Sequence, residues 1–153
     1  MRIVVVSDSH SNKWNLLEAI EREASADYVY FLGDGYRDIE FAHSKLSDKH
    51  SFVMVRGNCD LGSDLPDNDT RIINGIKVYA THGHNERVKF GTFNLEYMAR
   101  ENEYGLVLYG HTHQPTTNYI EGIHFFNPGS VKDGFYGVVD ITDNGIICIR
   151  KSL

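Results

Sequence analysis

Short apolar runs rich in β-branched residues constrain the fold of this chain most, because they stop at side chains that can bind a metal. Runs of this kind are typical of strands buried on both faces of a parallel sheet. Three of them end in pairs of such side chains spaced two residues apart: Asp8 and His10, His82 and His84, and His111 and His113. In extended backbone the side chains of residues i and i+2 point the same way, so each pair is expected to reach one point. The pattern indicates a metal site just beyond the strand ends.

Helical periodicity alternates with these runs in the first third of the chain. Apolar runs at 2–7, 28–32 and 52–55 predict three buried strands. One amphipathic helix is expected after a cap at Ser11 or Asn12, and a second over about 37–47. The apolar positions expected on the buried faces are Trp14, Leu17, Ile20 and Ala24 in the first helix, and Ile39, Ala42 and Leu46 in the second. Two successive strand–helix–strand units imply a parallel sheet with right-handed crossovers.

The rest of the chain is expected to add a hairpin, one helix and a β-rich end. Apolar residues on both sides of Asn74-Gly75 predict the hairpin, and a helix is expected around 92–103. Further strands are predicted at 106–109, 116–120, 123–126, 136–142 and 146–151. The last four are expected to form an antiparallel meander. The chain as a whole is therefore predicted to be an α/β protein with two sheets packed face to face and helices outside.

Composition narrows the class of protein. The chain has 153 residues with 41% hydrophobic and 24% charged residues, which suits one globular domain. It has no apolar run long enough to span a bilayer and no signal-peptide pattern at its start, so we expect a cytoplasmic protein without a membrane partner. The net charge of −6 disfavours binding of long duplex nucleic acid. Cys59 and Cys148 have no metal-type spacing.

Five polar clusters follow the apolar strands, and in open α/β sheets ligands bind outside the carboxyl ends of strands. Their imidazole, carboxylate and single amide donors suit Mn, Fe, Zn, Ni or Co better than Ca or Mg. The donors are too many for one tetrahedral ion, whereas one shared carboxylate could serve two ions. Two ions about 3.5–4 Å apart can clamp an in-line phosphoryl displacement. The clusters are Asp8-x-His10, Gly33-Asp34, Gly57-Asn58-Cys59-Asp60, His82-Gly83-His84 and Gly110-His111-x-His113.

The order of these motifs, followed by N-P-G-S at 127–130, resembles the calcineurin-like metallophosphoesterases. Within that superfamily the chain is most similar to the small YfcE-like phosphodiesterases, and the resemblance covers essentially all of it. Each motif alone is weak, but five in order at the spacing of one strand–helix unit are specific. The resemblance implies a single domain over residues 1–153, built as a four-layer α/β/β/α sandwich. Its sheets would be mixed, with a parallel N-terminal βαβαβ part and antiparallel C-terminal strands.

The resemblance also implies a site. Asp8, His10 and His113 would bind a first divalent metal, and Asn58, His82 and His111 a second, with Asp34 bridging the two. A hydroxide between the metals would attack phosphorus in line, which makes the chain a metal-dependent phosphodiesterase or phosphatase. Asp34, Asn58 and His111 would thus act in catalysis, with Asp60 orienting a ligand from behind. Manganese is the expected metal, with iron, zinc, nickel and cobalt open; the expected partner is a small phosphoester, and a homodimer or homotetramer is possible.

Two departures from the family pattern bear on function. Many relatives have a histidine after the G-N pair that assists the leaving group, and here that position is Cys59. A thiol replaces an imidazole poorly near neutral pH, which favours substrates whose leaving group needs little protonation. The family often has G-D-x-x-D, but Asp38 lies one residue further along, which leaves its supporting role in doubt.

Several alternatives stay open at this point. A non-catalytic or weakly catalytic protein-binding scaffold of the same fold would resemble the small subunit of the retromer coat, and degraded ligands would point to it. A nuclease acting on short or cyclic nucleotides is a second alternative. His84 could edge the site or serve a structural hydrogen bond. Arg37 and Arg56 could contact a phosphate, although each is more often a solvated or ion-paired side chain.

Overall fold

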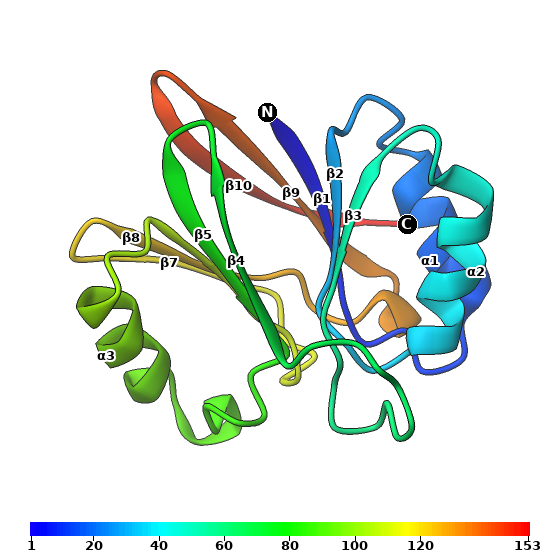
Figure 1. The fold of residues 1–153 in the computed structure, drawn as a ribbon, viewed down its shortest axis with the longest axis horizontal. Helices are drawn as coiled ribbons and strands as arrows, with labels where there is room; N and C mark the ends of the chain where they lie inside the picture. The colour runs from blue at the N-terminus through cyan, green and yellow to red at the C-terminus, as the bar shows by residue number, and fades with distance from the viewer.

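Three short strands that run in the same direction organise the N-terminal half of the protein. The structure is a computed structural model that describes residues 1–153. In it β1 (Arg2–Val6), β2 (Tyr28–Phe31) and β3 (Ser51–Met54) lie parallel, in the order β1-β2-β3. Helices α1 (Lys13–Glu21) and α2 (Tyr36–Leu46) connect them and cover one face of the sheet (Figure 1). The predicted βαβαβ start is confirmed.

A second sheet is built around a parallel pair that follows the predicted hairpin. Strands β4 (Asn68–Ile73) and β5 (Ile76–Thr81) pair around Asn74-Gly75, and both turn residues have positive φ, as a tight hairpin turn requires. Strand β6 (Leu106–Leu108) lies parallel to β5 and follows helix α3 (Phe93–Glu101). The short helix η1 (Val88–Phe90) precedes α3. This α3 packs on the outer face of the second sheet (Figure 1).

The C-terminal strands do not form the expected meander. They form two hairpins that join different sheets: β7 (Thr116–Ile120) with β8 (Ile123–Asn127), and β9 (Phe135–Thr142) with β10 (Gly145–Ser152). Strand β8 pairs with β6, whereas β9 crosses over through η2 (Val131–Asp133) and pairs antiparallel with β1. The final orders are β10-β9-β1-β2-β3 and β4-β5-β6-β8-β7. The meander prediction was wrong because strand alternation alone does not say which sheet a hairpin joins.

Helix α1 buries only part of the predicted face: Ile20 is buried and Leu17 partly so, whereas Trp14 and Ala24 are exposed. Leu16, Ala19 and Ile20 are its buried residues, while Trp14 is 64% exposed and packs its ring edge-on against Phe41. The prediction failed because α1 lies beside α2, so the large indole covers the neighbouring helix instead of the sheet. In α2 the predicted face is correct, since its three expected apolar residues are all buried.

The two sheets pack face to face with one apolar core between them and one core under each helical layer. This arrangement confirms the four-layer α/β/β/α sandwich. The two sheets approach closely where Gly137 of β9 faces the ring of Phe126 of β8, since a Cβ at position 137 would lie 2.3 Å from that ring. None of the helices combines the length and hydropathy needed to cross a bilayer.

We expect Gly137→Ala to destabilise the protein by about 1–3 kcal/mol, because the added methyl group overpacks against Phe126. In a Phe126→Leu background the same change should cost clearly less, because the smaller side chain leaves room for it. Urea unfolding of the four proteins gives the coupling free energy directly. An equal cost in both backgrounds would mean that this contact does not limit the approach of the sheets.

Candidate metal centre

The polar clusters lie together at one edge of the molecule, as the strand order predicts. The carboxyl ends of β1, β2, β3 and β5 point to the lower edge in Figure 1, where the loops that follow them meet. Backbone hydrogen bonds join these loops: the amide of Asp8 donates to Gly33 O at 2.9 Å, and that of His10 donates to Asp34 O at 3.1 Å. The amide of Gly110 donates to His82 O at 3.1 Å. Loops far apart in the sequence therefore form one frame.

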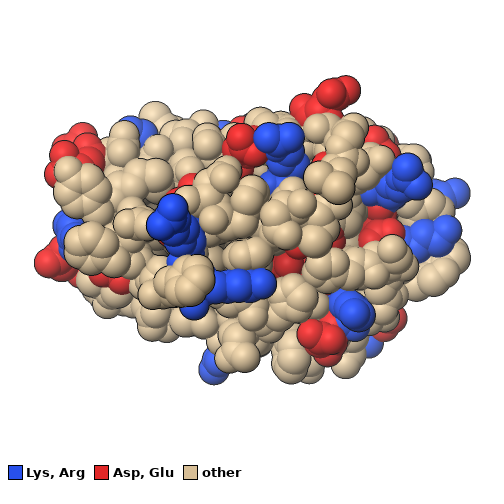
Figure 2. Space-filling view, turned by 90° about the horizontal axis from the view of Figure 1, so that it is seen from below, with Lys and Arg blue, Asp and Glu red and all other residues tan.

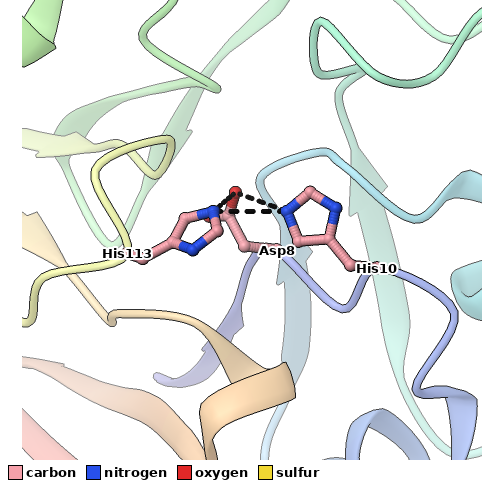
Figure 3. A group of neighbouring side chains, drawn as sticks. All are labelled: Asp8, His10 and His113. Atoms are coloured by element: carbon pink, nitrogen blue, oxygen red, sulfur yellow. Dashed lines mark hydrogen bonds and ion pairs between the residues drawn. The ribbon is translucent and has the colours of Figure 1, made fainter.

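Asp8, His10 and His113 form a first group in which side chains from two loops point toward one another (Figure 3). The Oδ1 atom of Asp8 lies 3.1 Å from Nε2 of His113 and 3.7 Å from Nε2 of His10. That oxygen is buried and has no hydrogen-bond partner. The two Nε2 atoms are 3.2 Å apart. An orphaned carboxylate oxygen facing two imidazole nitrogens is a donor set that suits a divalent transition metal.

Asp34, His82 and His111 form a second group beside the first. Nδ1 of His82 lies 2.6 Å from the carbonyl oxygen of Leu32, a contact that requires the proton on Nδ1, so Nε2 is the nitrogen that can bind a cation once it has lost its own proton. This Nε2 atom lies 3.3 Å from Oδ2 of Asp34 and 3.1 Å from Nδ1 of His111. A histidine whose outer nitrogen is anchored to a carbonyl is the usual orientation of a metal-binding imidazole.

Asp34 joins the two groups, because its Oδ2 atom also lies 3.8 Å from Nε2 of His10. Burial alone would raise the pKa of Asp34, but His82 and the amide of Cys59 hold that pKa well below its usual range. Burial and the nearby charges of His82 and Lys89 lower the pKa of His111 to about 4. An ionised carboxylate and a neutral imidazole are the forms that ligate cations.

Asn58 is the one predicted ligand that is neither a carboxylate nor an imidazole. Its side chain is exposed, and its amide nitrogen donates only to the sulfur of Cys59, at 3.3 Å. It lies in the turn after β3, next to Gly57, whose amide is held by Asp60. The part of Asn58 as a ligand stays a prediction.

Asp60, predicted among the catalytic residues, lies buried behind the site. Its Oδ2 atom accepts the amides of Asp34 and Gly57, both at 2.8 Å. Its Oδ1 atom accepts the amides of Gly35 and Tyr36, at 2.7 and 2.9 Å. Four donors fill the lone pairs of the carboxylate, so it holds two loops in register and has no capacity left for a substrate. Its place is that of a positioning residue.

Other polar residues that hold the loops were missed or doubted in the sequence. Asp38 accepts the hydroxyl of Ser9 at 2.5 Å and the amide of Ser11 at 2.9 Å, so its shifted spacing still supports the first loop. Asn127, fully buried, donates to Gly110 O at 2.9 Å, and Ser130 donates to Asp8 O at 2.9 Å. The N-P-G-S motif was the available signal, although its chemistry reads as a plain turn.

Backbone conformation brings the ligands together in a way the sequence argument did not anticipate. The expected extended backbone is wrong: five predicted ligands have positive φ, between 43° and 67°, namely Asp8, His10, Asp34, His111 and His113. The side chains of His111 and His113 also point into different groups instead of one. Left-handed backbone at non-glycine residues is uncommon and collects at functional sites, where surrounding contacts enforce it.

His84 lies at the edge of the second group. Its ring centroid is 5.4 Å from that of His82 and 6.2 Å from that of His111. Its Nδ1 atom is buried without a hydrogen-bond partner, and burial lowers its pKa. The predicted structural hydrogen bond is therefore absent at Nδ1, and the position favours the site-edge alternative.

Comparison with known proteins identifies the family. Residues 1–143 match the calcineurin-like phosphoesterase superfamily domain. The chain belongs to this superfamily. It is 28% identical to phosphodiesterase YfcE of Escherichia coli K12 over 179 aligned positions, which cover 97% of this chain and 91% of YfcE. The expected YfcE-like resemblance and the expected enzyme class, a metal-dependent phosphoester hydrolase, are thus confirmed at the level of the family.

Solved structures agree on the fold. A conserved Streptococcus pneumoniae TIGR4 protein, described as a predicted phosphoesterase, superposes with a TM-score of 0.82 at 28% identity, covering 99% of this chain and 88% of that one. A Vps29 single mutant from Entamoeba histolytica superposes with a TM-score of 0.75 at 18% identity, covering 100% of this chain and 99% of that one. The second likeness concerns the fold alone.

Calorimetric titration with Mn²⁺ should separate the site histidines from the others. We expect His10→Gln to weaken Mn²⁺ binding by at least about 10-fold, because an amide oxygen replaces an imidazole nitrogen that faces Asp8. His43→Gln is the matched control, since His43 is exposed on α2 and packs only against Phe52. Equal loss in both variants would remove His10 from the metal site.

Proposed function

We propose that this protein is a two-metal phosphodiesterase that hydrolyses small phosphodiesters. One observation carries the proposal: two groups of ligand-type side chains lie side by side, and the carboxylate of Asp34 reaches both. Its Oδ2 atom lies within 4 Å of His10 and His82, one from each group. Asp8 adds a buried oxygen that lacks a donor. Such a set suits two divalent cations that share one carboxylate, with manganese as the proposed pair.

Two divalent cations, when bound, would neutralise the phosphoryl oxygens and lower the pKa of water enough to give a hydroxide for in-line attack. The residues of this chain prepare that reaction. Asp34 stays ionised and provides the shared negative charge, while the neutral imidazole of His111 faces the same space. The hydrogen bond to Leu32 keeps the lone pair of His82 directed inward. Asp60 keeps the loops that carry Asp34 and Asn58 at a constant separation.

The surroundings of the site favour a small substrate. A pocket of about 180 Å³ opens directly on His10 and Asp34, which is room for a phosphoryl group and a small ester arm. Figure 2 views the molecule from the side of the site loops, and its Lys and Arg side chains are scattered among acidic and uncharged ones. Long duplex nucleic acid needs a continuous row of cations. Short or cyclic nucleotides remain within the proposed substrate class.

A protein-binding scaffold is the weaker candidate. A scaffold needs no ligand side chains, and their loss costs it nothing. In this chain all seven predicted positions carry metal-ligand residue types, and six of them face one another in the two groups. Five adopt the uncommon backbone that this convergence requires. These features favour a metal-binding catalytic site over a scaffold that needs no metal ligands.

Hydrolysis of bis(4-nitrophenyl) phosphate with added Mn²⁺ tests the proposal. We expect Asp34→Asn to lower kcat/KM by at least about 100-fold, because the amide removes the negative charge that both groups share. His43→Gln should keep the activity of the wild type. Wild-type activity in Asp34→Asn would contradict the proposed mechanism.

Cys59 offers a second test through the leaving group. Burial and the neighbouring Asp34 raise the pKa of its thiol, so it stays neutral near pH 7 and donates a proton poorly. It lies with His10 and Asp34 in one group of donor atoms. Cys59→His should therefore raise kcat for alkyl esters several-fold and change kcat for nitrophenyl esters little, since nitrophenolate needs no protonation. An unchanged ratio between the two ester types would mean that leaving-group protonation does not limit turnover.

A further inference from the structure

The pocket beside the two groups of candidate metal ligands is lined by more acidic than basic side chains. Three carboxylates line it, from Asp34, Asp38 and Asp60, together with the thiol of Cys59. Arg37 is the single Lys or Arg side chain on its wall. A phosphoester is an anion, so it meets an acidic wall on this side of the site and one fixed cation. The position of that cation therefore matters for how an anion is held.

Arg37 is held in place by its neighbour instead of by a carboxylate. Its Nε atom donates to the hydroxyl of Tyr36 at 3.0 Å, and its guanidinium carbon lies 5.6 Å from the centre of the Tyr36 ring. No acidic side chain forms an ion pair with it, whereas Arg56 is paired with Asp67 at 2.6 Å. The structure thus separates the two arginines that the sequence left undecided. Both terminal nitrogens of Arg37 stay free to donate.

Arg37 is exposed, but the backbone beside it is anchored by a hydrogen bond. The amide of Tyr36 donates to Oδ1 of Asp60, the same carboxylate that holds the amide of Asp34. Arg37 and the shared metal-ligand candidate are therefore linked through one buried carboxylate. A planar guanidinium with two free terminal nitrogens matches the spacing of two phosphoryl oxygens, which an ammonium group does not.

We propose that Arg37, held by Tyr36, binds the non-bridging oxygens of the substrate phosphoryl group in the pocket beside Asp34 and Cys59. The proposal rests on the proposed phosphodiesterase function and deepens it, because it assigns a residue that recognises the phosphoryl group itself. It makes Arg37 a substrate-binding residue that does not touch the metal. Recognition of this kind is independent of the ester arm, so it applies to diesters with different leaving groups.

Binding of inorganic phosphate to the Mn²⁺-loaded protein, measured by calorimetry, is the direct test. We expect Arg37→Gln to weaken phosphate binding about 10- to 100-fold, the usual range for hydrogen bonds to a charged group. The phosphate affinity of Arg37→Lys should fall in between, because lysine keeps the positive charge but lacks the paired donors of the planar guanidinium. Tyr36→Phe should weaken phosphate binding about 2- to 5-fold, since the guanidinium keeps its charge and loses its hydrogen bond to the Tyr36 hydroxyl. Mn²⁺ affinity should be the same in all of them.

Lys49→Gln is the matched charge control. Lys49 is exposed, has no ion pair and lies just before β3, at the opposite end of the sheet from the pocket. The Lys49→Gln substitution removes the same unit of positive charge as Arg37→Gln, and the variant should bind phosphate like the wild type. For a small diester, Arg37→Gln should raise KM with little change in kcat, as expected for uniform binding.

The outcomes distinguish the proposed role of Arg37 from the proposed phosphodiesterase function on which it rests. Wild-type phosphate affinity in Arg37→Gln, or an equal loss in Lys49→Gln, would overturn the role of Arg37 while Asp34→Asn still abolishes hydrolysis. A wild-type protein that binds Mn²⁺ but no phosphate would overturn it as well. Failure of the wild type to bind Mn²⁺ and to hydrolyse any phosphodiester would instead overturn the proposed function, and the Arg37 proposal with it.

Discussion

Two buried carboxylates with no lysine or arginine partner are the constraint on which this structure depends. Asp8 and Asp34 are almost fully buried, and only histidine nitrogens lie within ion-pair distance of either. A buried charge without compensation is costly, and Oδ1 of Asp8 has no hydrogen-bond donor at all. Divalent cations held between the carboxylates and the imidazoles would resolve the conflict. The strand order, the loops and the uncommon backbone all serve to keep these groups together.

The frame around the site is built from polar residues whose side chains hydrogen-bond to the loops. Asp60 ties the loops after β2 and β3, Asp38 ties the loop after β1, and Asn127 and Ser130 tie the loops after β1 and β6. Backbone amides and carbonyls satisfy most of these buried groups, so their hydrogen bonds do not depend on a cation. A preorganised cage of this kind loses little entropy when its ligands engage.

Much of the fold could be predicted from the sequence, because apolar period and turn residues report on each element locally. The parallel start, the Asn74-Gly75 hairpin and the buried face of α2 followed from such signals. The meander failed because the choice of sheet for β7 and β9 depends on contacts between distant segments. The buried face of α1 failed for a related reason, since Trp14 packs on Phe41 of the neighbouring helix.

The candidate site also combines features that the sequence predicts with features that depend on contacts between distant segments. Motif order identified the residues, but the extended-backbone argument for their convergence was wrong, because Asp8 and His113 have positive φ. At Asp8 this backbone is held by hydrogen bonds to Gly33 and from Ser130, which are distant in the sequence. Asn58 matches the motif position beside Cys59, and its part as a ligand stays a prediction. The support given by Asn127 could not be read from a turn motif, since its partners are distant in the chain.

Anomalous diffraction from a Mn²⁺-loaded crystal tests the central claim most directly. The account predicts two manganese peaks about 3.5–4 Å apart, one among Asp8, His10 and His113 and one beside His82 and His111, with Asp34 between them. A single peak, or peaks away from Asp34, would contradict a shared two-metal cage and leave the buried carboxylates without an explanation.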